Sequence, residues 1–170
     1  IGPLQDKTVA VIGYGSQGHA HAQNLRDSGI KVAIAEVEGT DNFSLAKDHG
    51  FAPADIKTAM DGAALIIITL PDEIQAKVYE TQIAPNLVPG QTIGFCHGFN
   101  IHFKYIVPPA DINVVMIAPK GPGHLVRSEY VKGGGVPNLI AVEQDASGDA
   151  KDIALAWANG IGGARAGIIE

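Results

Sequence analysis

The sequence predicts an α/β fold in which a mainly parallel sheet carries helices on both faces. Short apolar runs alternate with longer amphipathic stretches along the whole chain. Most of the apolar runs are rich in Val and Ile and almost continuously apolar, as strands buried on both faces are. Glycines mark the joins between these segments, at Gly29, Gly50, Gly62 and Gly90. Together these features favour repeated β-α-β units over an all-helical or all-β protein.

Each segment can be assigned in order. The expected strands are Thr8–Ile12, Val32–Ala35, Leu65–Thr69, Thr92–Phe95, Val114–Ala118 and Leu139–Val142. The expected helices are Ser16–Ser28, Phe43–His49, Ile56–Met60, Glu73–Ile83, Ile101–Ile106, Gly123–Lys132 and Asp149–Asn159. In a sheet of this kind the ligand crevice lies beyond the carboxyl ends of the strands. The residues that directly follow each strand are therefore the candidates for function.

The composition limits the class of protein. A length of 170 residues suits one domain, 1–170, and a hydrophobic content of 46% against 18% charged residues predicts a sizeable core rather than disorder. The net charge of −6 argues against a general nucleic-acid binder, which would present a basic face. No apolar run approaches the roughly 18 residues of a membrane span.

The compartment and the extent of the chain can also be estimated. Cys96 is the only cysteine, so no intramolecular disulfide can form, and a reducing compartment fits best. Because the N-terminus lacks the layout of a signal peptide, we expect a cytoplasmic protein. The chain has no starting Met and stops on an apolar run, 166–170, from which we expect a fragment of a longer protein.

Glycines are spaced as G-x-G-x-x-G between the first expected strand and the first expected helix. Gly13 would permit the tight turn, Gly15 would leave room for a pyrophosphate at the main chain, and Gly18 would let the helix pack closely on the sheet. The helix N-terminus would offer free N–H groups to the phosphates. With strand, helix and second strand in this order, the motif predicts a Rossmann-type dinucleotide-binding fold. A glycine-rich turn without a ligand is the alternative.

An acidic residue about 20 positions after the first glycine binds the adenine ribose in this fold. Glu36 lies 23 positions after Gly13, at the end of the second expected strand. A carboxylate there accepts hydrogen bonds from a free 2′-hydroxyl and repels a 2′-phosphate. The following loop, 37–42, contains two more acids and no Lys or Arg. These charges favour NAD over NADP, unless Glu36 is only a solvated strand end.

Two further strand ends carry candidate residues. Pro71 stops the third strand, and Asp72 is expected to cap the helix that begins near Glu73, in a turn that would border the nicotinamide half of the crevice. His97 follows the fourth strand and suits proton transfer, because the unperturbed pKa of histidine lies nearest neutrality. The alternative is a histidine that merely lines the cleft. Cys96 is interpreted as a small apolar filler rather than a nucleophile.

The remaining polar residues of the turns are less informative. Lys120 lies in a loop shaped by two prolines and two glycines, 119–124, where it would serve phosphate or substrate charge or remain solvated. His19 and His21 are two residues apart on a helix, so their side chains point to nearly opposite sides and cannot share one metal ion. We expect packing roles for both.

Four motifs in this order resemble the ketol-acid reductoisomerase family. They are GYGSQGHAHAQNLRDSG at Gly13–Gly29, LPDE at Leu70–Glu73, HGFNI at His97–Ile101 and APKGPGHLVR at Ala118–Arg127. The closing WANGIGGARAGIIE, from Trp157 to Glu170, also matches. The resemblance therefore spans nearly the whole chain and is far more specific than the glycine motif alone.

The resemblance implies an N-terminal Rossmann-type domain, followed in the family by an all-helical domain. The family converts 2-acetolactate to 2,3-dihydroxyisovalerate, and 2-aceto-2-hydroxybutyrate likewise, in branched-chain amino-acid biosynthesis. The reaction is a Mg²⁺-dependent alkyl migration followed by reduction with NAD(P)H. The resemblance also implies a homo-oligomeric full-length protein and His97 as the catalytic histidine. Combined with the strand-end argument, the expected cofactor-binding residues are Gly13, Tyr14, Gly15, Ser16, Gln17, Gly18, Glu36, Thr40, Asn42, Leu70, Pro71, Asp72, Glu73, Ile74, Gln75 and Gly123.

The sequence departs from the family pattern in the loop after the second strand. The family carries there an Arg and serines that hold the 2′-phosphate of NADPH, whereas this chain has Val37, Thr40 and Asn42, with Asp41 between the last two. Val37 removes a cation and Asp41 adds an anion. Both changes agree with the argument from Glu36 and predict that NADH is preferred over NADPH. The alternative is that Thr40 and Asn42 still hydrogen-bond a phosphate.

A second departure concerns the metal. The chain stops before the acidic segment of the family that supplies the ligands of two Mg²⁺ ions, and Mg²⁺ prefers oxygen ligands that include carboxylates. We therefore expect no metal site in residues 1–170, and cofactor binding without turnover by this chain alone. The competing interpretations are a β-hydroxyacid-type dehydrogenase, which would recruit a Lys or His from a following helical domain, and a non-catalytic dinucleotide sensor.

Overall fold

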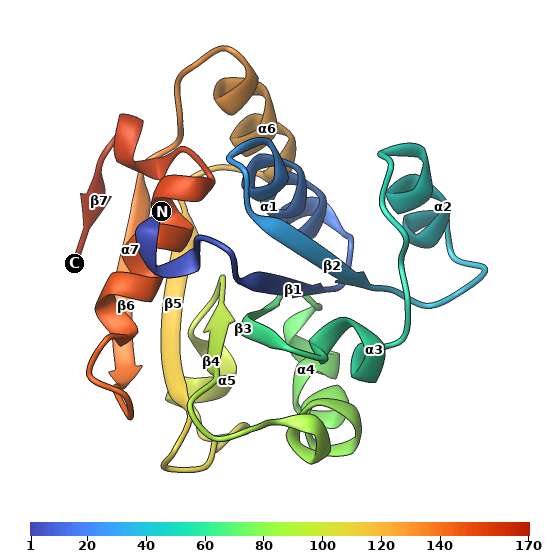
Figure 1. The fold of residues 1–170 in the computed structure, drawn as a ribbon, viewed down its shortest axis with the longest axis vertical. Helices are drawn as coiled ribbons and strands as arrows, with labels where there is room; N and C mark the ends of the chain where they lie inside the picture. The colour runs from blue at the N-terminus through green and yellow to red at the C-terminus, as the bar shows by residue number, and fades with distance from the viewer.

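The computed structural model describes residues 1–170, which form one sheet with helices on both of its faces (Figure 1). The strands are β1 (Thr8–Ile12), β2 (Lys31–Ala35), β3 (Ala63–Ile68), β4 (Thr92–Phe95), β5 (Asn113–Pro119), β6 (Asn138–Gln144) and β7 (Ile168–Ile169). The α-helices are α1 (Ser16–Asp27), α2 (Asp41–Asp48), α3 (Ile56–Met60), α4 (Asp72–Val78), α5 (Phe99–His102), α6 (Gly123–Val131) and α7 (Ala150–Gly160). A π-helical turn, Tyr79–Ile83, extends α4. None of these helices combines the length and the apolar character that crossing a membrane requires.

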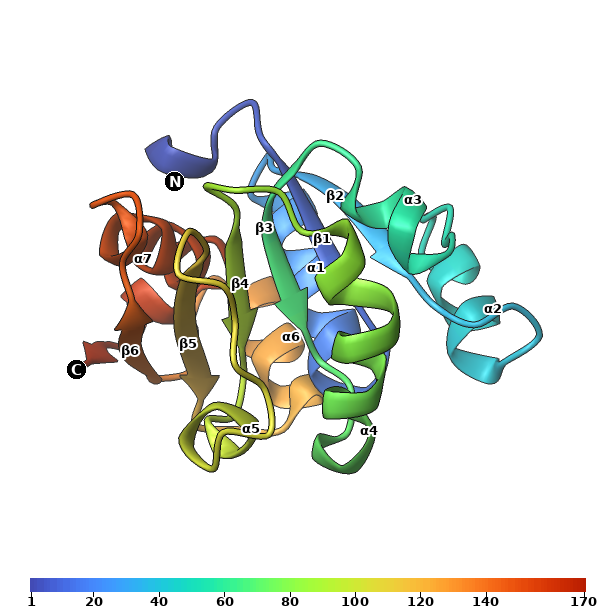
Figure 2. The same ribbon diagram turned by 90° about the horizontal axis from the view of Figure 1, so that it is seen from below.

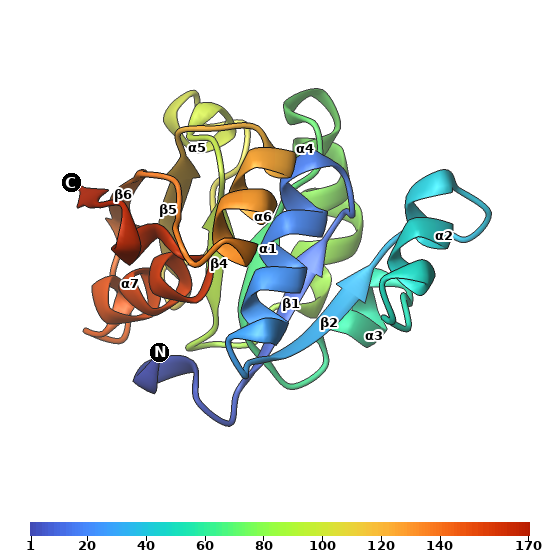
Figure 3. The ribbon, with the colours of Figure 1, turned by 90° about the horizontal axis from the view of Figure 1, so that it is seen from above.

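The sheet has the order β2-β1-β3-β4-β5-β6-β7. The first five strands run parallel, β6 is antiparallel to β5, and β7 is parallel to β6. Figure 3 shows α1, α6 and α7 in front of one face, and Figure 2 shows α3 and α4 on the other. The predicted doubly wound, mainly parallel fold is therefore confirmed. Because the chain leaves β1 toward β2 on one face and returns to β3 on the other, a ligand crevice is expected between β1 and β3.

The core explains why the strands read as continuous apolar runs. Leu65 and Ile67 of β3 belong to the cluster under α1 and α7, whereas Ile66 and Ile68 belong to the cluster under α3 and α4. All four side chains are fully buried. A strand that packs helices on both faces has no position left for a polar side chain.

Three segments differ from the prediction. The helix expected at Ile101–Ile106 is wrong in its bounds, because it spans Phe99–His102 and ends before Lys104, which takes the left-handed φ of 58°. The last long strand runs antiparallel, which its apolar content did not reveal. The apolar end of the chain forms the short strand Ile168–Ile169 beside it. All three lie away from the switch point between β1 and β3.

Candidate functional site

Two adjoining cavities open at the carboxyl ends of the central strands. One has a volume of about 650 Å³ and extends past the end of β2, and the other, of about 550 Å³, reaches His97 after β4. They share Gly13, Glu36, Leu70 and Ile74 along their common border. We treat them as one continuous cleft that crosses the switch point of the sheet.

Most of the residues predicted for the site line this cleft. They are Gly13, Tyr14, Gly15, Ser16, Gln17, Glu36, Asn42, Leu70, Pro71, Asp72, Ile74, Gln75 and His97. Four predicted residues, Gly18, Thr40, Glu73 and Gly123, do not line either cavity. Thr40 instead accepts a hydrogen bond from Phe43 N and so caps α2, while Glu73 is exposed.

The three glycines of the first turn have different surroundings. Gly13 takes a left-handed φ of 93°, which favours glycine. A Cβ on Gly18 would lie 2.1 Å from Gly13 O, so the start of α1 packs directly on the turn. A Cβ on Gly15 would meet no heavy atom within 4 Å. The main chain at Gly15 is therefore open to the cleft, at the N-terminus of a twelve-residue helix whose first N–H groups are free to bind an anion.

Glu36 lies at the end of β2, on the border of both cavities. Its Oε2 accepts a hydrogen bond from Tyr14 N at 2.8 Å, and its Oε1 accepts one from Val37 N at 2.8 Å. Each carboxylate oxygen can accept more than one hydrogen bond, so both keep capacity for a ligand hydroxyl. The carboxylate is thereby fixed beside the glycine turn and presents negative charge to the cleft.

Thr69 supports the same turn and was not recognised from the sequence. Its hydroxyl lies 2.8 Å from Gly13 O and 3.0 Å from Ile12 O, so it joins the end of β3 to the end of β1. The outer wall of the larger cavity was also missed, because it is built by the loop before α3 and by the helix after β3. Its residues include Pro53, Ala54, Asp55, Ile56, Val78 and Gln82. Asp55, which accepts a hydrogen bond from Thr58 N, marks the start of a helix in the sequence but gives no sign of a cavity.

Tyr14 connects the glycine turn to α2. Its side chain is fully buried, and its hydroxyl lies 3.0 Å from Nδ1 of His49, the residue that ends α2. Burial raises the pKa of Tyr14 to about 12, so the hydroxyl stays protonated and shares a hydrogen bond with the ring nitrogen. Desolvation, with a smaller contribution from the nearby His19, lowers the pKa of His49 and favours the neutral ring.

Replacing Tyr14 with phenylalanine is expected to lower the free energy of unfolding by about 1 kcal/mol, the usual value of one such hydrogen bond. Urea denaturation at neutral pH measures this change. Tyr79→Phe is the matched control, because the Tyr79 side chain is also buried but its hydroxyl has no hydrogen-bond partner in the protein. Equal losses in the two variants would show that the contact with His49 contributes nothing.

His21 links the core to the cleft. It is fully buried, and its Nδ1 accepts a hydrogen bond from Trp157 Nε1 at 3.0 Å. Its Nε2 therefore carries the proton and donates to Gln17 Oε1 at 3.1 Å, while Gln17 Nε2 donates to Gly121 O at 3.0 Å. Desolvation lowers the pKa of His21 to about 3, so the ring is neutral.

No three His, Cys, Asp or Glu side chains converge so as to hold a metal ion. His19 donates from Nδ1 to Gly15 O at 2.9 Å on the outer side of the same helix. The structural roles expected for His19 and His21 are thus the roles that their contacts show.

His97 and Asp72 meet at the far end of the cleft. His97 Nδ1 lies 2.6 Å from Asp72 Oδ2. The prediction that Asp72 caps α4 was wrong, because Pro71 is the capping residue and the Asp72 carboxylate turns toward His97 instead. Burial raises the pKa of the neighbouring Cys96 to about 12, so its thiol is protonated and behaves as the apolar filler that was expected.

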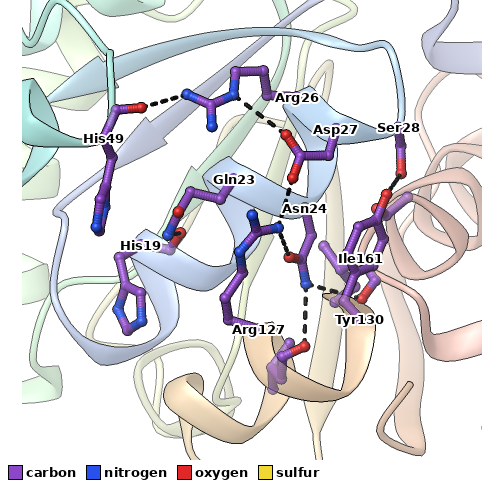
Figure 4. A network of polar contacts seen from close by, with 12 residues as sticks. His19, Gln23, Asn24, Arg26, Asp27, Ser28, His49, Arg127, Tyr130 and Ile161 are labelled. Carbon is purple, nitrogen blue, oxygen red and sulfur yellow. Dashed lines mark hydrogen bonds and ion pairs between the residues drawn. The ribbon is translucent and has the colours of Figure 1, made fainter. Parts of the chain in front are cut away.

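A polar network fixes α6 against α1 and so positions the loop after β5 (Figure 4). The buried Asn24 donates to Val126 O and Ile161 O and accepts from Arg127 Nη1, which also pairs with Asp27 at 2.8 Å. Together these contacts hold α6 against α1, so that the first residues of α6 lie on the glycine turn.

At that contact Gly123 N donates to Ser16 Oγ at 3.2 Å, and a Cβ on Gly123 would lie 1.5 Å from Ser16 O. Gly123 therefore supports the turn from behind rather than facing the cleft. Lys120, in the same loop, is exposed and lines neither cavity.

Comparisons with known proteins agree with this geometry. Residues 3–167 match the family described as acetohydroxy acid isomeroreductase, NADPH-binding domain. The chain is 47% identical to an NADH-preferring ketol-acid reductoisomerase from an uncultured archaeon, with a TM-score of 0.95 over 99% of this chain and 52% of that one. The chain thus spans about half the length of that solved relative.

Two other solved structures share the fold alone. A semialdehyde dehydrogenase NAD-binding protein from Cupriavidus necator has 23% identity and a TM-score of 0.80, over 95% of this chain and 62% of that one. A 3-hydroxyisobutyrate dehydrogenase from Mycobacterium tuberculosis has 17% identity and a TM-score of 0.70, over 96% and 53% of the two chains.

Proposed function

The chain belongs to the ketol-acid (acetohydroxy acid) reductoisomerase family as its cofactor-binding domain, and from that premise we propose that its cleft binds NADH. The observation that carries this proposal is the open main chain at Gly15, with the N-terminus of α1 behind it and the Glu36 carboxylate beside it. The diphosphate would lie at Gly15. The adenine half would occupy the larger cavity, and the nicotinamide would lie toward His97.

The residues of the cleft would have different roles in binding and catalysis. The glycine turn and α1 would bind the diphosphate, Glu36 would accept hydrogen bonds from the adenine ribose, and His97 would hold or move a proton at a substrate oxygen. The nicotinamide would supply hydride to a substrate carbonyl. Ser16 and Gln17, held by α6 and His21 respectively, would keep the turn in shape. We propose residues 1–170 as one domain with this single role.

The activity of the parent protein follows from the family. We propose that it isomerises and reduces 2-acetolactate and 2-aceto-2-hydroxybutyrate in branched-chain amino-acid biosynthesis, as a cytoplasmic homo-oligomer. The residues present do not fit a Mg²⁺ site, so we propose that the metal ligands come from outside residues 1–170 and that this chain alone does not turn over. Family membership replaces the alternative of a β-hydroxyacid-type dehydrogenase, to which the similarity is one of fold.

The preference between the two cofactors tests the proposed site. The unaltered chain is expected to bind NADH at least about ten-fold more tightly than NADPH, since a ten-fold ratio needs only about 1.4 kcal/mol and the Glu36 carboxylate opposes a 2′-phosphate. Fluorescence titration gives both dissociation constants. Tighter binding of NADPH would reject the preference, and no saturable binding of either cofactor would reject the proposed function.

Two variants separate the contributions to this preference. Glu36→Gln removes the opposing charge, and Val37→Arg adds a cation at an exposed position in the wall of the larger cavity. Both variants are expected to bring the dissociation constants for NADH and NADPH closer together, mainly by strengthening NADPH binding. Lys31→Gln, at the exposed opposite end of β2, is the control and should leave the ratio unchanged.

A further inference from the structure

Asp72 and His97 come from different turns, and their side chains meet at a short distance. His97 Nδ1 lies 2.6 Å from Asp72 Oδ2, although the two residues are 25 positions apart in the sequence. The His97 side chain is 67% exposed and that of Asp72 33% exposed, so an ordinary surface ion pair at this place would contribute little stability. The contact instead bears on which nitrogen of the imidazole ring carries the proton.

The two turns are joined beneath the pair by buried amides. Asn100 Nδ2 lies 3.0 Å from Asp72 O and 3.1 Å from Gln75 Oε1, and Gln75 Nε2 donates to Leu70 O at 2.7 Å. Asn100 and Gln75 are 2% and 3% exposed. A buried, satisfied amide pair of this kind fixes the spacing between the turn after β3 and the turn after β4. Asp72 therefore meets His97 from a fixed position.

Other contacts of His97 leave one ring nitrogen available. The ring stacks on Phe99 at an interplanar angle of 3° and a centroid distance of 6.3 Å. Nδ1 is engaged with Asp72, and Nε2 has no hydrogen-bond partner in the protein. His97 lines the smaller cavity. A neutral imidazole whose Nδ1–H faces a carboxylate must carry its lone pair on Nε2.

We propose that Asp72 is a positioning residue, whose carboxylate holds neutral His97 in the Nδ1–H form so that Nε2 serves as the proton acceptor in the cleft. The catalytic meaning of this arrangement rests on the proposed function. A proton leaves a substrate hydroxyl and binds Nε2, while Nδ1–H stays with Asp72 and the carboxylate faces the positive charge of the ring. The same proton returns from Nε2 to the alkoxide that alkyl migration leaves on the former ketone carbon. A second proton, taken up by Nε2 from water, then neutralises the oxygen that becomes an alkoxide when hydride reaches the carbonyl.

The tautomer can be read directly from this chain without cofactor. Long-range ¹H–¹⁵N NMR on ¹⁵N-histidine-labelled protein at a pH of about 9, well above the ordinary histidine pKa, distinguishes the two neutral forms. We expect the Nδ1–H form for His97 and the Nε2–H form, which a free imidazole prefers, in Asp72→Ala. Glu80→Ala is the matched control, because it removes an exposed carboxylate from the same helical segment. It should leave the Nδ1–H form in place.

Each result bears on the proposal. An Nε2–H form in the unaltered chain, or an Nδ1–H form that persists in Asp72→Ala, would overturn it. In the complete parent enzyme, Asp72→Ala is expected to lower kcat on the order of ten-fold or more, and Glu80→Ala to leave kcat unchanged. An unchanged kcat in Asp72→Ala would overturn the catalytic part. A failure of the unaltered chain to bind NADH would instead count against the proposed function and leave the tautomer result standing.

Discussion

Gly15→Ala is expected to weaken NADH binding by about 100-fold or more while leaving the fold intact. The φ of −75° lies outside the left-handed region that favours glycine, and an added Cβ would meet no protein atom within 4 Å. The methyl group would instead occupy the space through which the diphosphate approaches the main chain. A 100-fold loss corresponds to about 2.7 kcal/mol. Fluorescence titration and thermal unfolding of the same sample give binding and stability together.

Two other glycine substitutions serve as controls for this result. Gly2→Ala also adds a Cβ that meets nothing within 4 Å, but far from the cleft, and should change neither quantity. Gly18→Ala would place a Cβ 2.1 Å from Gly13 O and should destabilise the fold itself. If Gly15→Ala binds NADH as tightly as the unaltered chain, the diphosphate does not lie at this turn.

Acid is expected to destabilise the protein through His21. The pKa of His21 is lowered from 6.5 to about 3 in the folded state by desolvation, so between these values the unfolded chain binds the proton and the folded chain does not. The free energy of unfolding therefore falls as the pH drops below about 6.5, by as much as about 1.4 kcal/mol per pH unit, and this contribution levels off below about pH 3. By pH 4.5 the loss through this one group is about 2–3 kcal/mol.

Urea denaturation at a series of pH values measures the slope. His49 acts in the same direction, because its pKa is also lowered, so the share of His21 is the difference between the unaltered chain and His21→Gln. If that variant does not fold, direct NMR titration of His21 in the unaltered chain replaces it. A ring that titrates near pH 6.5 in the folded protein would contradict the expected neutral, buried histidine.

The sequence predicted most accurately those elements whose bounds depend on local composition. The bounds of β1 and β4 were predicted to the residue, because a strand buried on both faces ends where its apolar run ends. Strand β6 was harder to interpret, since one of its faces is only partly covered and apolar content does not encode strand direction. The early end of α5 depends on the backbone of Lys104, which no hydrophobic pattern specifies.

In the candidate site, too, the features set by local sequence were predicted and those set by distant contacts were not. The turns after β1, β2, β3 and β4 were identified because parallel strands bring their carboxyl ends to one edge of the sheet. The contacts of Asp72 with His97 and of His21 with Trp157 span 25 and 136 residues, and no local spacing predicts them. Asp72 was misassigned for this reason, since a capping position can be read from neighbouring residues but a distant histidine cannot.

The series of hydrogen bonds from Trp157 through His21 to Gln17 also has an optical consequence. Trp157 is the only tryptophan of the protein, so the intrinsic tryptophan emission of the domain comes from one indole. Its Nε1 donates a hydrogen bond to His21, which in turn contacts Gln17 beside the glycine turn. Reduced nicotinamide absorbs where indole emits. Energy transfer from Trp157 would therefore report occupancy of the cleft in the unlabelled domain, with no dye or added fluorophore.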